Sequence, residues 1–288
     1  MTLTVQQQTS ILQLILAMFN TSPGGANLKV LGSRLLNDPS LANLAQSLAE
    51  SPLFFDKDYA AMSPVEFAAI FVDDLFGNRV SISNKTLIFD FIANQMATGV
   101  TQGELISELT GVFSSIPTSD PNWGEAAAHY NTHNATKIVD HLLADTFTLT
   151  DKAMVVDHIL TQIASGKTLG RMIMWAINTL VDADHNNPVW GKAAVLLNNR
   201  IEVSKYYSID KASSAIALVA LQQILSKVTG DAATVAAAKT AIDNLLDVRN
   251  GLPDNVGKDF QLNEEWQGKR SNLLSMPLRI SIATELIF

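Results

Sequence analysis

The chain has 288 residues, a formal net charge of −8 and no cysteine, so disulfides, thiolate metal sites and a cysteine nucleophile are all excluded. Hydrophobic residues make up 47% of the chain and aromatic residues only 7%, a balance that favours close-packed helices over a β-sandwich. The 20 lysines and arginines form no basic stripe, and because phosphate backbones need clustered positive charge, we expect no nucleic-acid partner.

The first predicted helix spans residues 4–19, where three consecutive glutamines support helical propensity. Its apolar part, residues 11–19, is too short to span a bilayer. No lysine or arginine precedes Lys29, so the positively charged start of a secretory signal is missing. We therefore expect a core-facing helix that stays in the mature protein, and no transmembrane segment.

Cap and breaker residues divide the chain that follows into further helices. Short polar side chains mark helix starts. Gly99 and Gly166 lie at helix ends, where a residue in the left-handed conformation is favoured. The predicted caps are Ser63, Ser83, Thr101, Asp120, Thr150 and Thr168. The predicted helices cover residues 27–36, 41–50, 65–76, 84–96, 102–114, 151–165, 169–181, 209–228 and 232–248, and two more begin near Trp123 and Trp190.

Two Trp-Gly pairs indicate an internal duplication. Trp123-Gly124 and Trp190-Gly191 lie 67 positions apart, and this offset relates residues from about 66–131 to about 133–198 without a gap. The matched pairs include Asp73 and Asp140, Lys85 and Lys152, Asp90 and Asp157, Thr101 and Thr168, and Gly103 and Gly170. We expect both tryptophans to be buried in equivalent environments, where they fill the joint between helices.

The sequence therefore predicts an all-α fold, a multi-helix array with a duplication at a 67-residue offset and a short irregular C-terminal tail. We divide it into an N-terminal helical unit (1–62), a first repeat unit (63–131), a second repeat unit (132–205), and a C-terminal helical pair with the tail (206–288). Within the tail, residues 278–288 fit either a strand or an exposed terminal segment.

A calcium site is one candidate function. Asp182, Asp184 and Asn186 place oxygen ligands at alternate positions, as a calcium loop does. The sixth position of this loop is Asn187 rather than glycine, and the twelfth is Ala193 rather than glutamate. These departures favour a helix-connecting loop over a calcium site.

His129 and His133, four positions apart on a predicted helix, could both reach one metal ion. No third ligand stands at a suitable spacing, so polar residues on a helix surface are the stronger interpretation. The adjacent acids Asp73 and Asp74 point about 100° apart on a helix, which argues against joint acid–base work.

Other residues fit structural roles better than catalytic ones. Met172, Met174, Trp175 and Ile177 are predicted to pack in the core. The chain contains no Gly-x-Ser-x-Gly elbow, and no other catalytic motif stands out, so we expect no enzyme.

Several short segments resemble a known family. Residues 6–14, the turn at 18–24 and residues 40–45 resemble the helical N-terminal region of proteobacterial surface-layer and RTX-type secreted proteins. Residues 120–124 and 198–207 resemble its later landmarks, although the family reads closer to Asn-Lys where this chain has Asn199-Arg200. The resemblance covers roughly residues 5–210. The chain lacks the glycine-aspartate nonapeptide repeats and the long β-rich body of such proteins.

This resemblance implies type I export and a role in a surface coat or adhesin, whose related members anchor a lattice to lipopolysaccharide. The last five residues, 284–288, fit the C-terminal export signal of such substrates, and they fit equally a terminal segment docked on the core. We expect an extracellular structural protein of the bacterial surface that associates with itself and anchors to envelope polysaccharide. A monomeric carbohydrate- or small-ligand-binding module is the alternative.

Overall fold

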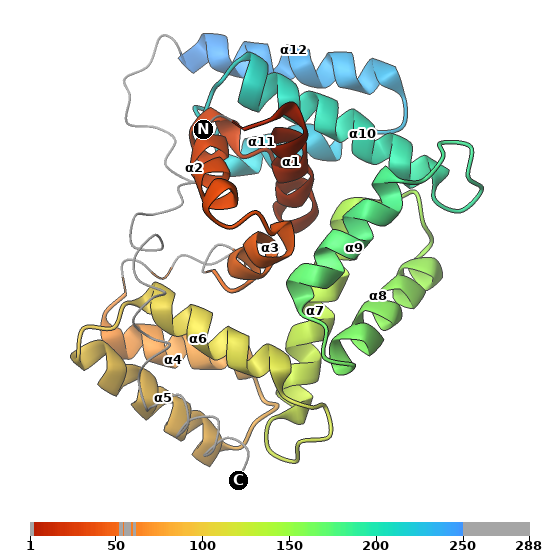
Figure 1. Cartoon of the computed structure of the whole chain (residues 1–288). Coiled ribbons are helices and arrows are strands. Elements are labelled where there is room, and N and C mark those ends of the chain that lie inside the picture. Colours follow the sequence, from red (N-terminus) through yellow and green to blue (C-terminus); the bar gives the residue numbers. More distant parts are fainter. Residues whose placement is uncertain (1–2, 52–53, 55–58, 60–61, 250–288) are drawn as a thin grey trace. The chain divides into compact units, whose positions relative to one another are not determined.

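The computed structural model describes residues 3–51, 54, 59 and 62–249, and this part of the chain contains twelve α-helices and no strand (Figure 1). The prediction of an all-α fold is confirmed. The predicted tail, residues 250–288, lies outside the described residues. The helices are α1 (Val5–Phe19), α2 (Gly24–Asn37), α3 (Leu41–Ala49), α4 (Pro64–Phe76), α5 (Ile82–Ala97), α6 (Gln102–Ser115), α7 (Gly124–Leu143), α8 (Leu149–Ala164), α9 (Leu169–Val181), α10 (Gly191–Lys205), α11 (Leu218–Ser226) and α12 (Ala232–Arg249), and the π-helix η2 (Tyr206–Asp210) directly follows α10.

Contacts divide the described residues into two units. The first combines residues 3–46, 136–159 and 168–249, and the second combines the described part of 47–135 with 160–167. Helices α7 and α8 therefore contribute to both units. The division of the sequence at residues 62, 131 and 205 follows the duplication, whereas these units follow packing.

Helix α1 is the centre of the first unit. It packs against α2, α9 and α10, and α10 in turn packs against α12 (Figure 1). All residues from Ile11 to Phe19 except Gln13 are buried. Each large apolar side chain buried in this way contributes about 1.5–3 kcal/mol. The predicted core-facing helix is confirmed.

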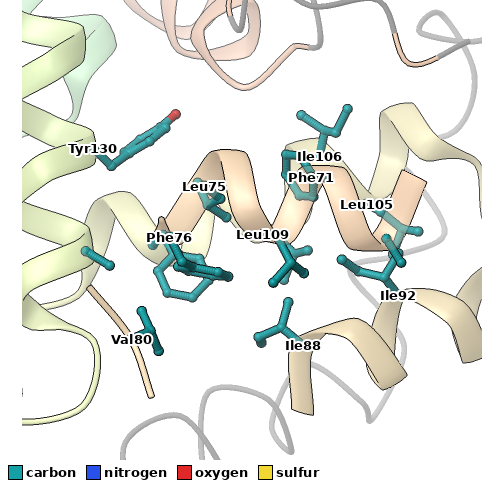
Figure 2. Close-up of a cluster of buried hydrophobic side chains, with 14 of the residues drawn as sticks. Phe71, Leu75, Phe76, Val80, Ile88, Ile92, Leu105, Ile106, Leu109 and Tyr130 are labelled. Carbon is teal, nitrogen blue, oxygen red and sulfur yellow. The ribbon is translucent and has the colours of Figure 1, made fainter. Parts of the chain in front are cut away.

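The second unit has an aromatic core between α4, α5, α6 and the start of α7. Phe71, Ile88 and Leu109, one from each of α4, α5 and α6, are buried together (Figure 2). At one end of this core the ring centroids of Phe76 and Phe113 lie 4.7 Å apart, and Trp123 packs 5.3 Å from Phe113. Such edge-to-face aromatic contacts add to the energy of burial alone.

Helix starts follow the capping chemistry of the sequence, with a correction at two of them. Reciprocal capping boxes join Thr4 with Gln7, Ser63 with Glu66, and Thr101 with Glu104. The caps of α5 and α8 are Ser81 and Thr148 rather than the predicted Ser83 and Thr150. A cap hydroxyl accepts from the backbone N–H three residues later, and the two hydroxyls that do so belong to the earlier residues.

Local geometry recurs at the offset of 67 positions. Helices α5 and α8 begin at residues 82 and 149 and end at 97 and 164. Gly77 and Ala144 both take a positive φ, 52° and 43°, directly after a helix. The backbone carbonyls of Asp73 and Asp140, each four residues earlier, accept the N–H groups of these residues, and the two carboxylates pair with Lys85 and Lys152 at 2.9 and 2.8 Å.

Three buried serines join the start of the first unit to its later helices. Ser22 Oγ donates to the carbonyl of Ser204, accepts from Ser204 Oγ at 2.7 Å, and lies 2.5 Å from Ser208 Oγ. Ser208 Oγ also accepts the backbone N–H of Gly24 at 3.0 Å. The turn between α1 and α2 is thereby fixed to the end of α10 and to η2.

The same region caps helix α2. Its first backbone N–H groups find distant partners: Gly24 donates to Ser208 Oγ, Gly25 to the Ser213 carbonyl and Ala26 to Ser214 Oγ. Helix α2 therefore begins at Gly24, three residues before the predicted start at 27. A Cβ on Gly25 would lie 2.6 Å from the carbonyl oxygen of Ala212, so this close approach requires glycine.

The predicted helix over residues 209–228 is wrong, because the chain turns away to reach α2. Ala212 takes a left-handed φ of 47°, and regular helix resumes only at Leu218, the first residue of α11. The left-handed conformation costs about 1–2 kcal/mol for a residue with a Cβ. Long-range hydrogen bonds to Ser213 and Ser214 offset this cost.

We predict that Ser208→Ala lowers the free energy of unfolding by about 1–3 kcal/mol, because it leaves the N–H of Gly24 and the Ser22 hydroxyl without their shared partner. Urea unfolding followed by circular dichroism measures this loss. Ser33→Ala is the control, since Ser33 is exposed on α2 and donates only to the Lys29 carbonyl of its own helix. Equal stability of the two variants would contradict the importance of the serine contact.

Candidate functional site

An open groove runs along one face of α9. Arg171, Met174, Trp175, Asn178 and Asp182 follow the spacing of a single helix face, and Thr179 with Ala42 of α3 complete the lining. The groove has a volume of about 480 Å³, within the range of roughly 300–1,000 Å³ that is usual for ligand sites.

The opposite face of α9 is core. Met172 and Ile177 are buried, as predicted, whereas Met174 and Trp175 are partly exposed in the groove. The prediction that all four residues pack in the core is therefore wrong for Met174 and Trp175. These two side chains offer apolar surface to a ligand.

Helices α3 and α8 hold the groove in place. The backbone N–H of Gly170 donates to Gln46 Oε1 at 2.8 Å, and a Cβ at this position would meet the Ala42 carbonyl oxygen and lie 2.6 Å from the Gln46 nitrogen. On the other side, His158 of α8 packs its ring 4.6 Å from the ring of Trp175. The indole is thus oriented by packing rather than free to rotate.

The two charged side chains of the groove lie at opposite ends of α9. Arg171 stands in the first turn and Asp182 at the C-cap, and both are exposed. Eleven residues of helix separate them by about 16 Å, far beyond salt-bridge distance. Neither forms an ion pair with any residue of the described chain.

The first repeat unit carries different residues at the equivalent positions. Glu104 stands in place of Arg171, Glu108 in place of Trp175, and Ser115 in place of Asp182. Aligning the two units is the signal in the sequence that could have found this groove, because it separates residues that serve the shared fold from residues that differ.

The two Trp-Gly pairs share a backbone arrangement but not the same burial. Gly124 and Gly191 each approach a backbone carbonyl, of Thr118 and His185 respectively, too closely for a Cβ. Trp123 is 3% exposed, whereas Trp190 is partly exposed and packs on Phe147 with ring centroids 5.0 Å apart. The expectation of equivalent burial is therefore wrong.

The neighbours of Trp190 differ from those of Trp123. The residues equivalent to Phe76 and Phe113, which pack near Trp123, are Leu143 and Leu180. Both leucines line a small apolar cavity of about 10 Å³ beside Trp190, and Trp175 lines it too. Phe147 stands in place of Val80, and the second copy leaves its tryptophan more exposed than the first does.

The calcium candidate lies in the loop between α9 and α10. Asp184 Oδ1 accepts the N–H of Asn186 at 2.7 Å, and Asn187 Oδ1 accepts from Val189 and Trp190 at 2.9 Å each. Asp182 faces the groove instead. These hydrogen bonds shape the start of α10, and calcium binding by Asp182, Asp184 and Asn186 stays a prediction. Within the described residues no three His, Asp or Glu side chains gather as a metal site.

His129 and His133 stack with ring centroids 6.4 Å apart on the exposed side of α7. Partial burial lowers the pKa of His129, and the charges of Arg79 and His133 lower it further. The nearby guanidinium disfavours a bound cation.

The adjacent acids Asp73 and Asp74 serve different contacts. Asp73 pairs with Lys85, while Asp74 accepts from Tyr59 Oη.

Arg200, at the position equivalent to His133, is buried in the first unit. Its Nη1 donates to the carbonyl of His141 at 2.8 Å. Burial lowers the pKa of the guanidinium, and the charge of Asp145 works in the opposite direction. This contact connects α10 to the end of α7.

No protein-family model, curated protein or solved structure matches this chain. Within the described residues, no helix has both the length and the apolar character to cross a membrane. The groove must therefore be interpreted from its own chemistry.

We predict that Gly170→Ala lowers the melting temperature, because the new methyl group clashes with backbone atoms of α3 that cannot rotate away. Gly103→Ala is the matched control at the equivalent position of α6, where a Cβ would meet no atom within 4 Å. That control should gain about 0.5–1 kcal/mol, as glycine in a helix is less favourable than alanine. A Gly170→Ala protein as stable as the wild type would rule out the close approach of α3 and α9.

Proposed function

We propose that this chain is a structural protein of the bacterial cell surface that binds envelope polysaccharide through the α9 groove. In this proposal the protein is exported and associates with copies of itself. Saccharide binding is supported by the groove, in which Trp175 has a fixed orientation and is surrounded by polar side chains. The resemblance to surface-layer proteins supports the location.

The chemistry of the groove suits a sugar. One face of many sugar rings carries C–H groups, which pack on the flat surface of an indole. The hydroxyl groups around the ring need donors and acceptors, and Arg171, Asn178, Thr179 and Asp182 supply both kinds. An open groove also suits a polymer, because such a site does not enclose its ligand.

We predict that Trp175→Ala weakens binding of purified lipopolysaccharide-derived polysaccharide about tenfold or more, the equivalent of at least ~1.4 kcal/mol. Trp175→Phe should retain most of the affinity because it keeps an aromatic face. Isothermal titration with the saccharide freed of its lipid measures both. Val219→Ala, exposed on α11, is the control for unrelated surface changes. Unchanged affinity in Trp175→Ala would exclude the groove as the binding site.

Exposed apolar residues that recur in both repeat units support self-association. Ile82 and Leu149, the first residues of α5 and α8, are 85% and 83% exposed, and Leu87 and Met154 are 43% and 59% exposed. Each pair is related by the offset of 67 positions. The start of α5 and the start of α8 thus each expose an apolar side chain, and two equivalent contact points on one chain favour open assemblies over a closed dimer.

We predict that the wild-type protein forms species larger than a monomer with rising concentration, and that Ile82→Ser with Leu149→Ser shifts it towards the monomer. Both positions are exposed at helix starts, so the fold should tolerate the change. Analytical ultracentrifugation reports the sizes, and Val219→Ser serves as the control. A wild-type protein that stays monomeric at all concentrations would exclude the self-association part of the proposal.

A further inference from the structure

We infer that the α9 groove selects an acidic saccharide and binds it in one direction, with the anionic group at Arg171 and an uncharged, hydroxyl-bearing end at Asp182. This inference rests on the proposed binding of saccharides and adds the class and orientation of the ligand.

The first support is the separation of charge. Arg171 and Asp182 line the same groove, and about 16 Å of helix keeps them apart. A ligand that lies along α9 therefore meets a guanidinium at one end, the Trp175 ring near the middle and a carboxylate at the other end. A guanidinium binds carboxylate or phosphate groups through paired hydrogen bonds, whereas a carboxylate accepts from hydroxyl groups and repels anions.

The second support comes from the direction of α9. The N-terminal end of a helix carries partial positive charge and the C-terminal end partial negative charge. Arg171 lies at the positive end and Asp182 at the negative end, so each side chain strengthens the field of the helix instead of compensating it. This placement is unfavourable for the helix alone, and an anion bound beside Arg171 would relieve it.

The third support is the equivalent helix of the first repeat unit. There Thr101 and Glu104 form a reciprocal capping box at the start of α6. Thr168 keeps the cap hydroxyl and accepts from the N–H of Arg171 at 3.3 Å, but Arg171 occupies the place of the glutamate. The second copy thus has Arg171, a base that faces the groove. At the equivalent position the first copy has Glu104, an acid that stabilises its own helix.

This comparison provides a decisive variant. Arg171→Glu restores the residue pattern of the capping box, so the melting temperature should stay the same or rise. The same change replaces the cation of the groove by an anion. Loss of binding in this variant could not then be attributed to loss of folding.

The probes are 3′-sialyllactose, which carries one carboxylate at one end, and its methyl ester, which has the same shape without the charge. We expect the wild type to bind the acid about tenfold more tightly than the ester at low salt, and the preference to shrink as salt is added. Arg171→Glu should lose this preference or reverse it. Trp175→Ala should weaken binding of both probes.

Orientation is tested with tetragalacturonate, whose carboxylates reach both ends of the groove. We expect Asp182→Asn to bind it several-fold more tightly than the wild type, because the repulsion at that end is removed. Unchanged or weaker binding by this variant would overturn the assigned direction.

Selection of an acidic group and binding of a saccharide predict different outcomes with these probes. Equal Trp175-dependent binding of the acid and the ester would leave saccharide binding intact and overturn selection of an acidic group. A preference for the acid that survives in Arg171→Glu would overturn the role of Arg171. Failure of the wild type to bind any of the three probes would overturn selection of an acidic saccharide, whereas failure to bind lipopolysaccharide-derived polysaccharide as well would overturn the proposed function.

Discussion

The first unit depends on hydrogen bonds among Ser22, Ser204 and Ser208, which join its first helices to its later ones. They connect residues more than 180 positions apart in a region from which water is excluded. Closing so long a loop costs entropy, but this cost grows only slowly with length, and several hydrogen bonds with the buried face of α1 offset it. The turn after α1 is fixed to the end of α10, and the buried face of α1 packs against α9. The helix that carries the groove is therefore supported from its buried side by a contact far away in the sequence.

Local chemistry made most of the helices predictable. Capping residues, prolines, glycines and the spacing of apolar residues act within a few positions, so Thr101 and Thr168 open α6 and α9 as expected. The errors arose where a distant partner decides. Helix α2 begins at Gly24 because Ser208, Ser213 and Ser214 accept its first N–H groups. No sequence pattern near residue 24 predicts these distant acceptors. The same partners break the helix predicted at 209–228, where hydrophobicity alone favoured continuity.

The sequence did not predict the groove either, because a helix face is buried or exposed according to distant packing partners. Residues 172–177 are apolar on all sides, and periodicity cannot tell which of Met172, Met174 and Trp175 faces a neighbouring helix. That choice is made by tertiary packing: α9 packs against α1 and α10, while Gly170 lets α3 approach so closely that Ala42 lines the groove. The duplicated sequence held a usable signal. Where two copies share a backbone arrangement, a tryptophan in one and a glutamate in the other indicate a position that the fold does not dictate.

The two copies also differ in how they balance stability against exposure. Around Trp123, Phe76 and Phe113 fill the joint, and a capping box secures α6. Around Trp190, Leu143 and Leu180 replace the two phenylalanines, and α9 has a cation in its first turn. The leucines make fewer contacts than the phenylalanines, and the cation is unfavourable at the start of a helix, so both changes lower local stability. All of them lie on or beside the wall formed by Trp175. The second copy, which is less tightly packed at this point, keeps an oriented aromatic ring and unpaired charges at its surface. Ligand-binding sites commonly combine these features.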